Sequence, residues 1–286
     1  MTESNLLKAI LQDIREIPPL PEVTTKVLQM TNDPDVSAAE LNRVISTDEA
    51  LTANVLKLCN SAYYGLPRVI SSVTQAIMYL GFQTVRNMVL STAVDHVYAK
   101  VDLSAYNHTQ NGLSEHSFAV AVASQVISKR LRPGLGDTAF TAGLLHDVGK
   151  IVLAKYVRGS KERLIELSGS PHITRDAELE ILGTDHAQVG SQIADHWNFP
   201  QELTLAIGYH HNPEDARGRP LLAVITYLAN NVVLRLGNGL LSGPVVLPIS
   251  EYCAEATGYT EETVDALGEE VRGAIQSMAT AANKGR

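Results

Sequence analysis

Apolar residues recur three and four positions apart through most of the chain, which is the spacing of an amphipathic helix. The first such stretch stops at residues 18–21, Pro-Pro-Leu-Pro, because proline lacks an amide hydrogen and restricts the residue before it. The spacing therefore predicts a first helix whose apolar face carries Leu6, Leu7, Ile10, Leu11 and Ile14.

Capping boxes mark further helix starts in the first hundred residues. In this pattern a Ser or Thr is followed three positions later by Glu or Gln. It occurs at residues 37–40, 46–49 and 72–75, each time ahead of an apolar-periodic stretch. Residues 60–67 are typical of a turn, and helical spacing resumes from residue 84 to about residue 98. This part of the chain is predicted to be a compact set of short helices.

The second half has the same spacing, and we expect loops at residues 132–137 and 237–242. Only residues 243–248 have an extended pattern, which is too short to imply a sheet, and no repeat at a fixed period is visible. The predicted architecture is therefore all-α. Its second half has helices at residues 116–130, 138–156 (one helix or a pair), 176–182, 186–197, 202–211, 221–236 and 260–282.

The last predicted helix has one apolar face. This face either packs on the rest of the chain, which we favour, or forms the contact of a homodimer. It carries Val264, Leu267, Val271, Ile275 and Met278.

Composition excludes some functions. The chain has 286 residues and a net charge of −8, which argues against nucleic-acid binding because phosphate contacts need a basic face. The sequence contains no run of about 18 apolar residues, so it predicts no membrane-spanning helix. Cys59 and Cys253 form no motif and suit a reducing compartment. We expect a cytoplasmic protein.

Residues 144–150, Leu-Leu-His-Asp-Val-Gly-Lys, carry the strongest chemical signal. The adjacent imidazole and carboxylate of His146 and Asp147 suit a divalent cation such as Zn, Mn or Fe. Beside an apolar run these groups are costly to bury unless their charge and lone pairs are used. They therefore predict either a metal site or a buried hydrogen-bond network.

Four more histidines lie near the ends of predicted helices, where the chain is free to aim them inward. We predict that four helices converge on one or two cations. An isolated histidine is more often an ordinary core or surface residue, which is our interpretation of His96, His108, His172 and His196. The predicted metal-binding set is His116, His146, Asp147, His186, His210 and His211.

Lys150 follows His146 by four residues, which would place both on one helix face. Two roles stay open for Lys150. It contacts a ligand phosphate as a point charge, or it complements the dipole at the C-terminus of a helix.

Together these stretches resemble the HD superfamily of metal-dependent phosphohydrolases, which includes the HD-GYP phosphodiesterases of cyclic dinucleotides. They resemble the HDOD domain family more closely. The resemblance implies an all-helical bacterial regulatory or signal-output module. We expect an N-terminal helical subdomain at residues 1–100, an HD-like subdomain at 101–236, and a loop and helical tail at 237–286. The resemblance covers about residues 15–235 through the segments at 18–21, 44–65, 70–81, 146–150, 183–190 and 197–200.

Two departures from the superfamily bear on catalysis. HD hydrolases complete the metal site with a distal Asp, and the best matching position here is Asn230. A neutral amide can still belong to the metal-binding set, but it is a weaker ligand for a hard cation and cannot act as a base. The Gly-Tyr-Pro element of the cyclic-dinucleotide enzymes is also missing after His211, which argues against hydrolysis of cyclic di-GMP.

We predict a regulatory protein without catalysis that acts through signalling proteins and binds a divalent metal (Fe, Mn or Zn) or a nucleotide in this pocket. The alternative is a metal-dependent phosphohydrolase acting on a nucleotide. In that case Asp147 and Lys150 would be the catalytic residues, and Lys150 would also contact the ligand. A third alternative is a purely structural scaffold.

Overall fold

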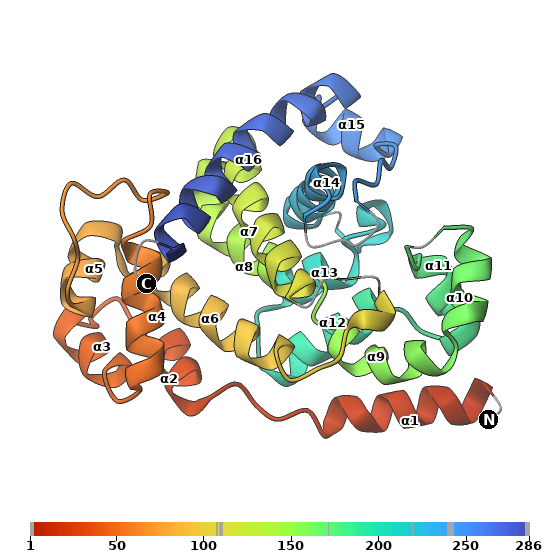
Figure 1. Cartoon of the computed structure of the whole chain (residues 1–286), viewed down its shortest axis with the longest axis horizontal. Coiled ribbons are helices and arrows are strands. Elements are labelled where there is room, and N and C mark those ends of the chain that lie inside the picture. The colour runs from red at the N-terminus through yellow and green to blue at the C-terminus, as the bar shows by residue number, and fades with distance from the viewer. Residues whose placement is uncertain are drawn as a thin grey trace. The chain divides into compact units, whose positions relative to one another are not determined.

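The computed structural model describes residues 3–106, 108, 111–170, 172–218, 220–238 and 243–283 (Figure 1). Every regular element within these ranges is an α-helix or a short 3₁₀-helix, so the all-α prediction is confirmed. The chain forms two compact units. Unit 1 combines Met1–Pro18 with Val97–Glu269, and unit 2 combines Pro19–His96 with Glu270–Arg286. The three predicted domain ranges stay a prediction.

Unit 2 contains a small helical core. Its buried side chains come from five helices and include Val27, Leu41, Val55, Ile77 and Val89. These helices are α2 (Glu22–Met30), α3 (Ala38–Ile45), α4 (Glu49–Cys59), α5 (Val73–Leu80) and the greater part of α6 (Phe82–Tyr98), and the unit also includes the later turns of α16 (Glu261–Asn283).

Of the three predicted capping boxes, one is confirmed, one is wrong, and one forms only the contact of its hydroxyl group. The Ser37 hydroxyl accepts from the Glu40 amide at 3.2 Å, and the Glu40 carboxylate accepts from the Ser37 amide at 2.9 Å. The second box is wrong because Ser46 ends α3, so Asp48 caps α4. The hydroxyl of Ser72 caps α5 as expected. The Gln75 side chain, however, accepts from the amide of Ser71, one residue before the predicted partner.

Unit 1 contains the remaining helices, of which α7, α8, α13 and α14 pack together (Figure 1). The predicted stretch at residues 138–156 is a pair of helices. The predicted loop at 132–137 is largely helical, and α10 and α15 were not expected. The helices are α1 (Glu3–Arg15), α7 (Gly112–Leu131), α8 (Gly136–Leu145), α9 (Lys150–Gly159), α10 (Lys161–Ser168), α11 (Arg175–Leu182), α12 (His186–His196), α13 (Gln201–Gly208), α14 (Leu221–Leu236), α15 (Glu251–Thr257) and the first turns of α16 (Glu261–Asn283), with 3₁₀-helices η1 (Ser104–Tyr106), η2 (Pro133–Leu135) and η3 (Pro213–Asp215).

The close packing of α7 on α8 depends on Gly143. A β-carbon at this position would lie 2.6 Å from the Ser124 hydroxyl oxygen and 2.7 Å from the Val120 carbonyl oxygen. Such distances are well inside van der Waals contact, so any larger residue would push the helices apart. This pair of helices supplies the framework on which the polar residues described below are placed.

The first and last helices of unit 1 are fastened by polar contacts. Asp13 of α1 pairs with Lys155 at 2.6 Å and accepts from the Tyr156 hydroxyl, both on α9. Arg235 of α14 pairs with Asp265 of α16 at 2.9 Å.

The apolar face predicted for the last helix is covered by the chain itself. Val264, Leu267 and Val271 are fully buried, and Ile275 is half-buried. The side chain of Met278 lies outside the described residues. Burial within a single chain supports the favoured alternative over a homodimer contact for this face. Within the described ranges, no helix combines the length and apolar character that crossing a membrane requires.

Candidate metal centre

The His-Asp pair lies in the break between α8 and α9, which a glycine makes possible. His146 ends α8, and Gly149 precedes α9. A β-carbon on Gly149 would lie 2.0 Å from the His186 carbonyl oxygen and 2.7 Å from the Gly190 amide nitrogen. Glycine therefore allows the start of α9 to touch the start of α12, which brings Asp147 close to His186.

Asp147 is the centre of the site. Its Oδ2 lies 3.3 Å from His146 Nε2 and 3.8 Å from His116 Nε2. Its Oδ1 lies 3.3 Å from His186 Nε2 and 3.9 Å from His210 Nε2. These five side chains are almost completely buried, although they come from α7, the break after α8, the start of α12 and the end of α13. The structure therefore brings together residues that are up to 94 positions apart in the sequence.

The rings of His146 and His210 are oriented by their own backbone. Each ring donates from Nδ1 to the carbonyl oxygen three residues earlier, Gly143 for His146 and Ile207 for His210, both at 2.7 Å. Each Nε2 is buried without a hydrogen-bond partner in the described part of the chain. Fixing the proton on Nδ1 leaves a lone pair on Nε2, as in metal-binding histidines. These two lone pairs face Asp147.

His186 is oriented by a carboxylate that the sequence interpretation missed. Glu178 Oε2 accepts from His186 Nδ1 at 2.6 Å and from the His186 amide at 2.9 Å. Glu178 Oε1 accepts from the Tyr106 hydroxyl at 2.6 Å. A carboxylate behind a histidine is a common outer partner of metal ligands. Asp185 caps α12, accepting from the Gln188 amide at 2.7 Å.

The other predicted site residues also lie here. His211 Nε2 is 2.8 Å from His186 Nε2. The Asn230 side-chain oxygen accepts from His116 Nε2 at 3.1 Å. Lys150 donates to Asp147 Oδ2 at 2.7 Å. Lys150 is the first residue of α9, because the helix breaks at 146–149. Of the two roles left open for Lys150, the one at a helix C-terminus is therefore wrong, as is its expected position on one helix face with His146.

Burial and charge set the protonation of the cluster. Burial lowers the pKa of His116, His210 and His211 well below the usual value. Burial acts on His186 in the same direction, but the Glu178 carboxylate outweighs it and raises the pKa of His186. Burial would raise the pKa of Asp147, yet neighbouring positive charge, including the Lys150 ammonium, holds it well below the usual range. The site therefore places an ionised carboxylate beside the Lys150 ammonium and the neutral imidazoles of His116, His210 and His211.

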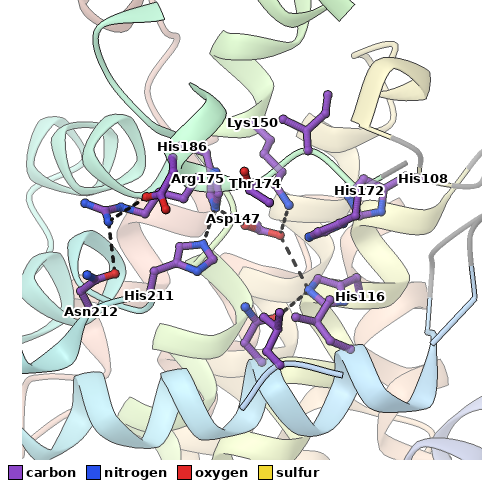
Figure 2. Close-up of a pocket in the computed structure, with 15 residues that line it drawn as sticks. His108, His116, Asp147, Lys150, His172, Thr174, Arg175, His186, His211 and Asn212 are labelled. Atoms are coloured by element: carbon purple, nitrogen blue, oxygen red, sulfur yellow. Dashed lines mark hydrogen bonds and ion pairs between the residues drawn. The ribbon is translucent and has the colours of Figure 1, made fainter. Parts of the chain in front are cut away.

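A cavity of about 210 Å³ opens onto Asp147, Lys150 and His186 (Figure 2). His108 and His172 also line this cavity, which their interpretation as ordinary core or surface residues did not anticipate. His96 and His196 are exposed. Burial lowers the pKa of His172 to about 4.

Arg175 braces the cavity wall that carries the histidines of α12 and α13. Its Nε donates to Asp185 at 2.8 Å, and its Nη1 donates to the Asn212 side chain at 3.2 Å. The start of α12 and the segment after His211 are thereby tied together. Figure 2 shows the contact between Arg175 and Asn212.

The residues fit a divalent cation. Two groups have ligand atoms within 4.8 Å of one another: His116, His146 and Asp147, and the trio His186, His210 and His211. Imidazole nitrogen with carboxylate oxygen is a donor set that Zn, Mn and Fe accept. The orphaned, buried Nε2 atoms of His146 and His210 are the kind of polar group that a cation would satisfy. The role of these residues as ligands stays a prediction.

An all-helical unit with a His-Asp pair in a helix break, and with further histidines converging on that pair, defines an HD-like helical module. The chain belongs to the HDOD domain family, which matches residues 17–213. The predicted family is therefore confirmed.

One curated protein is similar to most of this chain. A curated relative, an uncharacterized protein of Treponema pallidum (strain Nichols), is 26% identical over 247 residues, which are 83% of this chain and 46% of that protein. The chain thus spans about half the length of the curated relative it matches.

Two solved structures resemble the whole chain. A candidate phosphohydrolase from Shewanella amazonensis SB2B has 25% identity and a TM-score of 0.71, and the likeness covers 96% of this chain and 97% of that one. An HDOD domain protein of unknown function from Geobacter sulfurreducens has 24% identity and a TM-score of 0.77, covering 99% and 98%.

Proposed function

We propose that this chain is a regulatory HDOD module whose His-Asp pocket binds a divalent cation and does not hydrolyse phosphodiesters. The observation that carries the proposal is the pair of buried Nε2 lone pairs of His146 and His210, both aimed at the Asp147 carboxylate. Such atoms are costly to bury without a partner. A cation would satisfy both.

Asn230 supports the absence of turnover. It is the best match to the position at which HD hydrolases carry an Asp, and its oxygen accepts a hydrogen bond from His116. An amide supplies neither charge for a hard cation nor a base for a water molecule. A bound cation would supply positive charge. The hydrogen bonds from Nδ1 of His146, His186 and His210 would hold these rings with Nε2 directed at the cation. The output would be contact with signalling proteins.

A metal-dependent phosphohydrolase acting on a nucleotide is the second candidate. The cavity places the Lys150 ammonium beside Asp147, where a phosphate could reach both the ammonium and a cation. The similar candidate phosphohydrolase from Shewanella amazonensis supports this alternative. Lys150 and Asp147 would then be the catalytic residues.

Metal content and turnover of the purified protein separate the two candidates. We expect bound Zn, Mn or Fe, and no hydrolysis of cyclic dinucleotides, nucleoside triphosphates or bis(p-nitrophenyl) phosphate with any of these metals. Turnover that disappears in His146→Ala would overturn the proposal and support the hydrolase. Asn230→Asp restores the missing carboxylate, so a gain of rate in that variant alone would identify Asn230 as the reason for the lost activity.

A further inference from the structure

The two carboxylate oxygens of Asp147 face different surroundings. Figure 2 shows Lys150 and His116 approaching Asp147 from one side and His186 and His211 from the other. Oδ2 faces His116, His146 and Lys150, and we name this the Oδ2 side. Oδ1 faces His186 and His210, and with His211 these form the Oδ1 side.

The Oδ2 side already contains a positive charge. The Lys150 ammonium lies 2.7 Å from Oδ2, and its side chain is only 8% exposed. It also lies over the Tyr106 ring, 5.4 Å from the centroid, which stabilises a cation in this position. A divalent cation on the same oxygen would meet the ammonium at close range in a buried, weakly screened environment. The ammonium and a metal ion therefore compete for Oδ2.

The Oδ2 side is also poor in lone pairs. His116 Nε2 donates its hydrogen to the Asn230 oxygen, and this is the nitrogen that faces Asp147. A nitrogen that carries a hydrogen has no lone pair for a metal. The amide of Asn230 adds no negative charge. Of the two imidazole nitrogens that face Oδ2, His146 Nε2 is thus the one with a free lone pair, whereas the unpartnered nitrogen of His116 is its Nδ1.

The Oδ1 side has the opposite character. His186 is backed by the Glu178 carboxylate at 2.6 Å, which adds negative charge behind a ligand. His210 presents an orphaned Nε2, and the ligand atoms of His186, His210 and His211 lie within 4.8 Å of one another. His186 Nε2 and His211 Nε2 lie 2.8 Å apart and share one hydrogen, which belongs to His211 because His186 donates from Nδ1 to Glu178. A cation on this side would require that hydrogen to move to His211 Nδ1. Three imidazole nitrogens and one carboxylate oxygen then make a four-ligand set of the kind that Zn²⁺ takes in proteins.

We propose that the pocket takes one divalent cation, held on the Oδ1 side by His186, His210, His211 and Asp147, and that Lys150 stands in for a second cation on the Oδ2 side. This inference rests on the proposed cation binding. The Lys150 ammonium is then a built-in charge that keeps the pocket mononuclear.

Stoichiometry tests the number of cations. Protein stripped with a chelator is titrated with Zn²⁺ and with Co²⁺ in a calorimeter, and bound metal is counted by mass spectrometry after gel filtration. We expect one ion per chain in the wild type and in Lys155→Met, a control that removes a lysine paired with Asp13 and 62% exposed. We expect two ions per chain in the double variant Lys150→Met/Asn230→Asp, which removes the ammonium and supplies a carboxylate.

Single variants test the location. His210→Gln should lower the stoichiometry from one to zero, and His116→Gln should keep it at one, with circular dichroism showing that each variant is folded. The inference is overturned by two ions in the wild type, by one ion in the double variant, or by loss in His116→Gln with retention in His210→Gln. Two ions in the wild type leave the proposed function standing, whereas no binding of any divalent cation removes the proposed function as well.

Discussion

Glu178 is not one of the predicted metal ligands, but it determines how one of them is held. Its two oxygens accept from the ring and amide of His186 and from Tyr106. It is fully buried, and burial would raise its pKa, but the contacts with His186 hold the pKa below the usual value. Glu178 therefore stays ionised and fixes both the orientation and the charge of His186.

Removing the charge of Glu178 should weaken cation binding without changing the shape of the site. Loss of an outer partner of this kind typically costs about 10- to 100-fold in metal affinity. We expect Glu178→Gln to raise the dissociation constant for Zn²⁺ by that factor in calorimetry. Glu180→Gln, an exposed position on the same helix, is the control and should bind like the wild type. Equal affinity in the two variants would contradict the role assigned to Glu178.

Residue types could be predicted from the sequence better than their partners. The convergence of His116, His146, His186 and His210 was foreseeable because each lies near a helix end. Glu178 was not, because its contact with His186 depends on the turn at residues 183–185 that joins α11 to α12, and a glutamate on a helix gives no local signal of burial.

At the scale of elements, the break between α8 and α9 decides where the chemistry lies. The apolar spacing at residues 138–156 predicts helix on both sides but not the position of the break. The backbone contact between Gly149 and His186 sets that position, and it involves residues 37 positions apart in the sequence. This tertiary contact explains why one of the two roles left open for Lys150 placed it at the wrong end of a helix.

Gly149→Ala should therefore separate the starts of α9 and α12. Overpacking of this kind typically costs about 1–3 kcal/mol of the free energy of unfolding, and we expect cation affinity to fall with it because Asp147 and His186 move apart. Urea unfolding followed by the fluorescence of Trp197 measures the first effect, and calorimetry measures the second. Gly159→Ala is the matched control, since a β-carbon there meets nothing within 4 Å.

At the scale of the whole molecule, the buried histidines make unit 1 sensitive to acid. His116, His210 and His211 have a lowered pKa, and that of His172 is about 4, all because of burial. Between these values and the unfolded value of about 6.5, the unfolded chain binds more protons than the folded chain, so stability falls as pH falls. The raised pKa of His186 makes the folded chain more stable as pH falls toward the unfolded-state pKa. Below that pKa its contribution to stability no longer changes with pH.

We expect the free energy of unfolding of the chelator-treated protein to decline from about pH 6.5 downward, by up to about 1.4 kcal/mol per pH unit for each of the four histidines. Urea unfolding at pH 7.5, 6.5 and 5.5 measures the slope. His210→Gln should reduce the slope by about one proton, whereas the exposed His196→Gln should not. A stability that stays constant down to pH 5 would be inconsistent with neutral buried rings.

Cation removal should be visible in the same experiment. A ligand that binds only the folded chain stabilises it by about 2.7 kcal/mol at 100 times its dissociation constant. We expect Zn²⁺ at that excess to raise the unfolding free energy of the wild type by this amount at pH 7.5. The increase should be absent in His210→Gln. An increase of the same size in that variant would place the cation elsewhere.

The fit of Gly149 against α12 has a consequence for how such sequences are recognised in genomes. The glycine of the His-Asp-Val-Gly-Lys signature is required by a contact between two backbones, and any chain that keeps these two helices in touch must keep it. Selection on folding alone can thus preserve this glycine whether or not a chain hydrolyses a phosphate ester. A survey that counts the signature therefore counts folded pockets, and under the proposed function the residue that matches Asn230 is the one to inspect for activity.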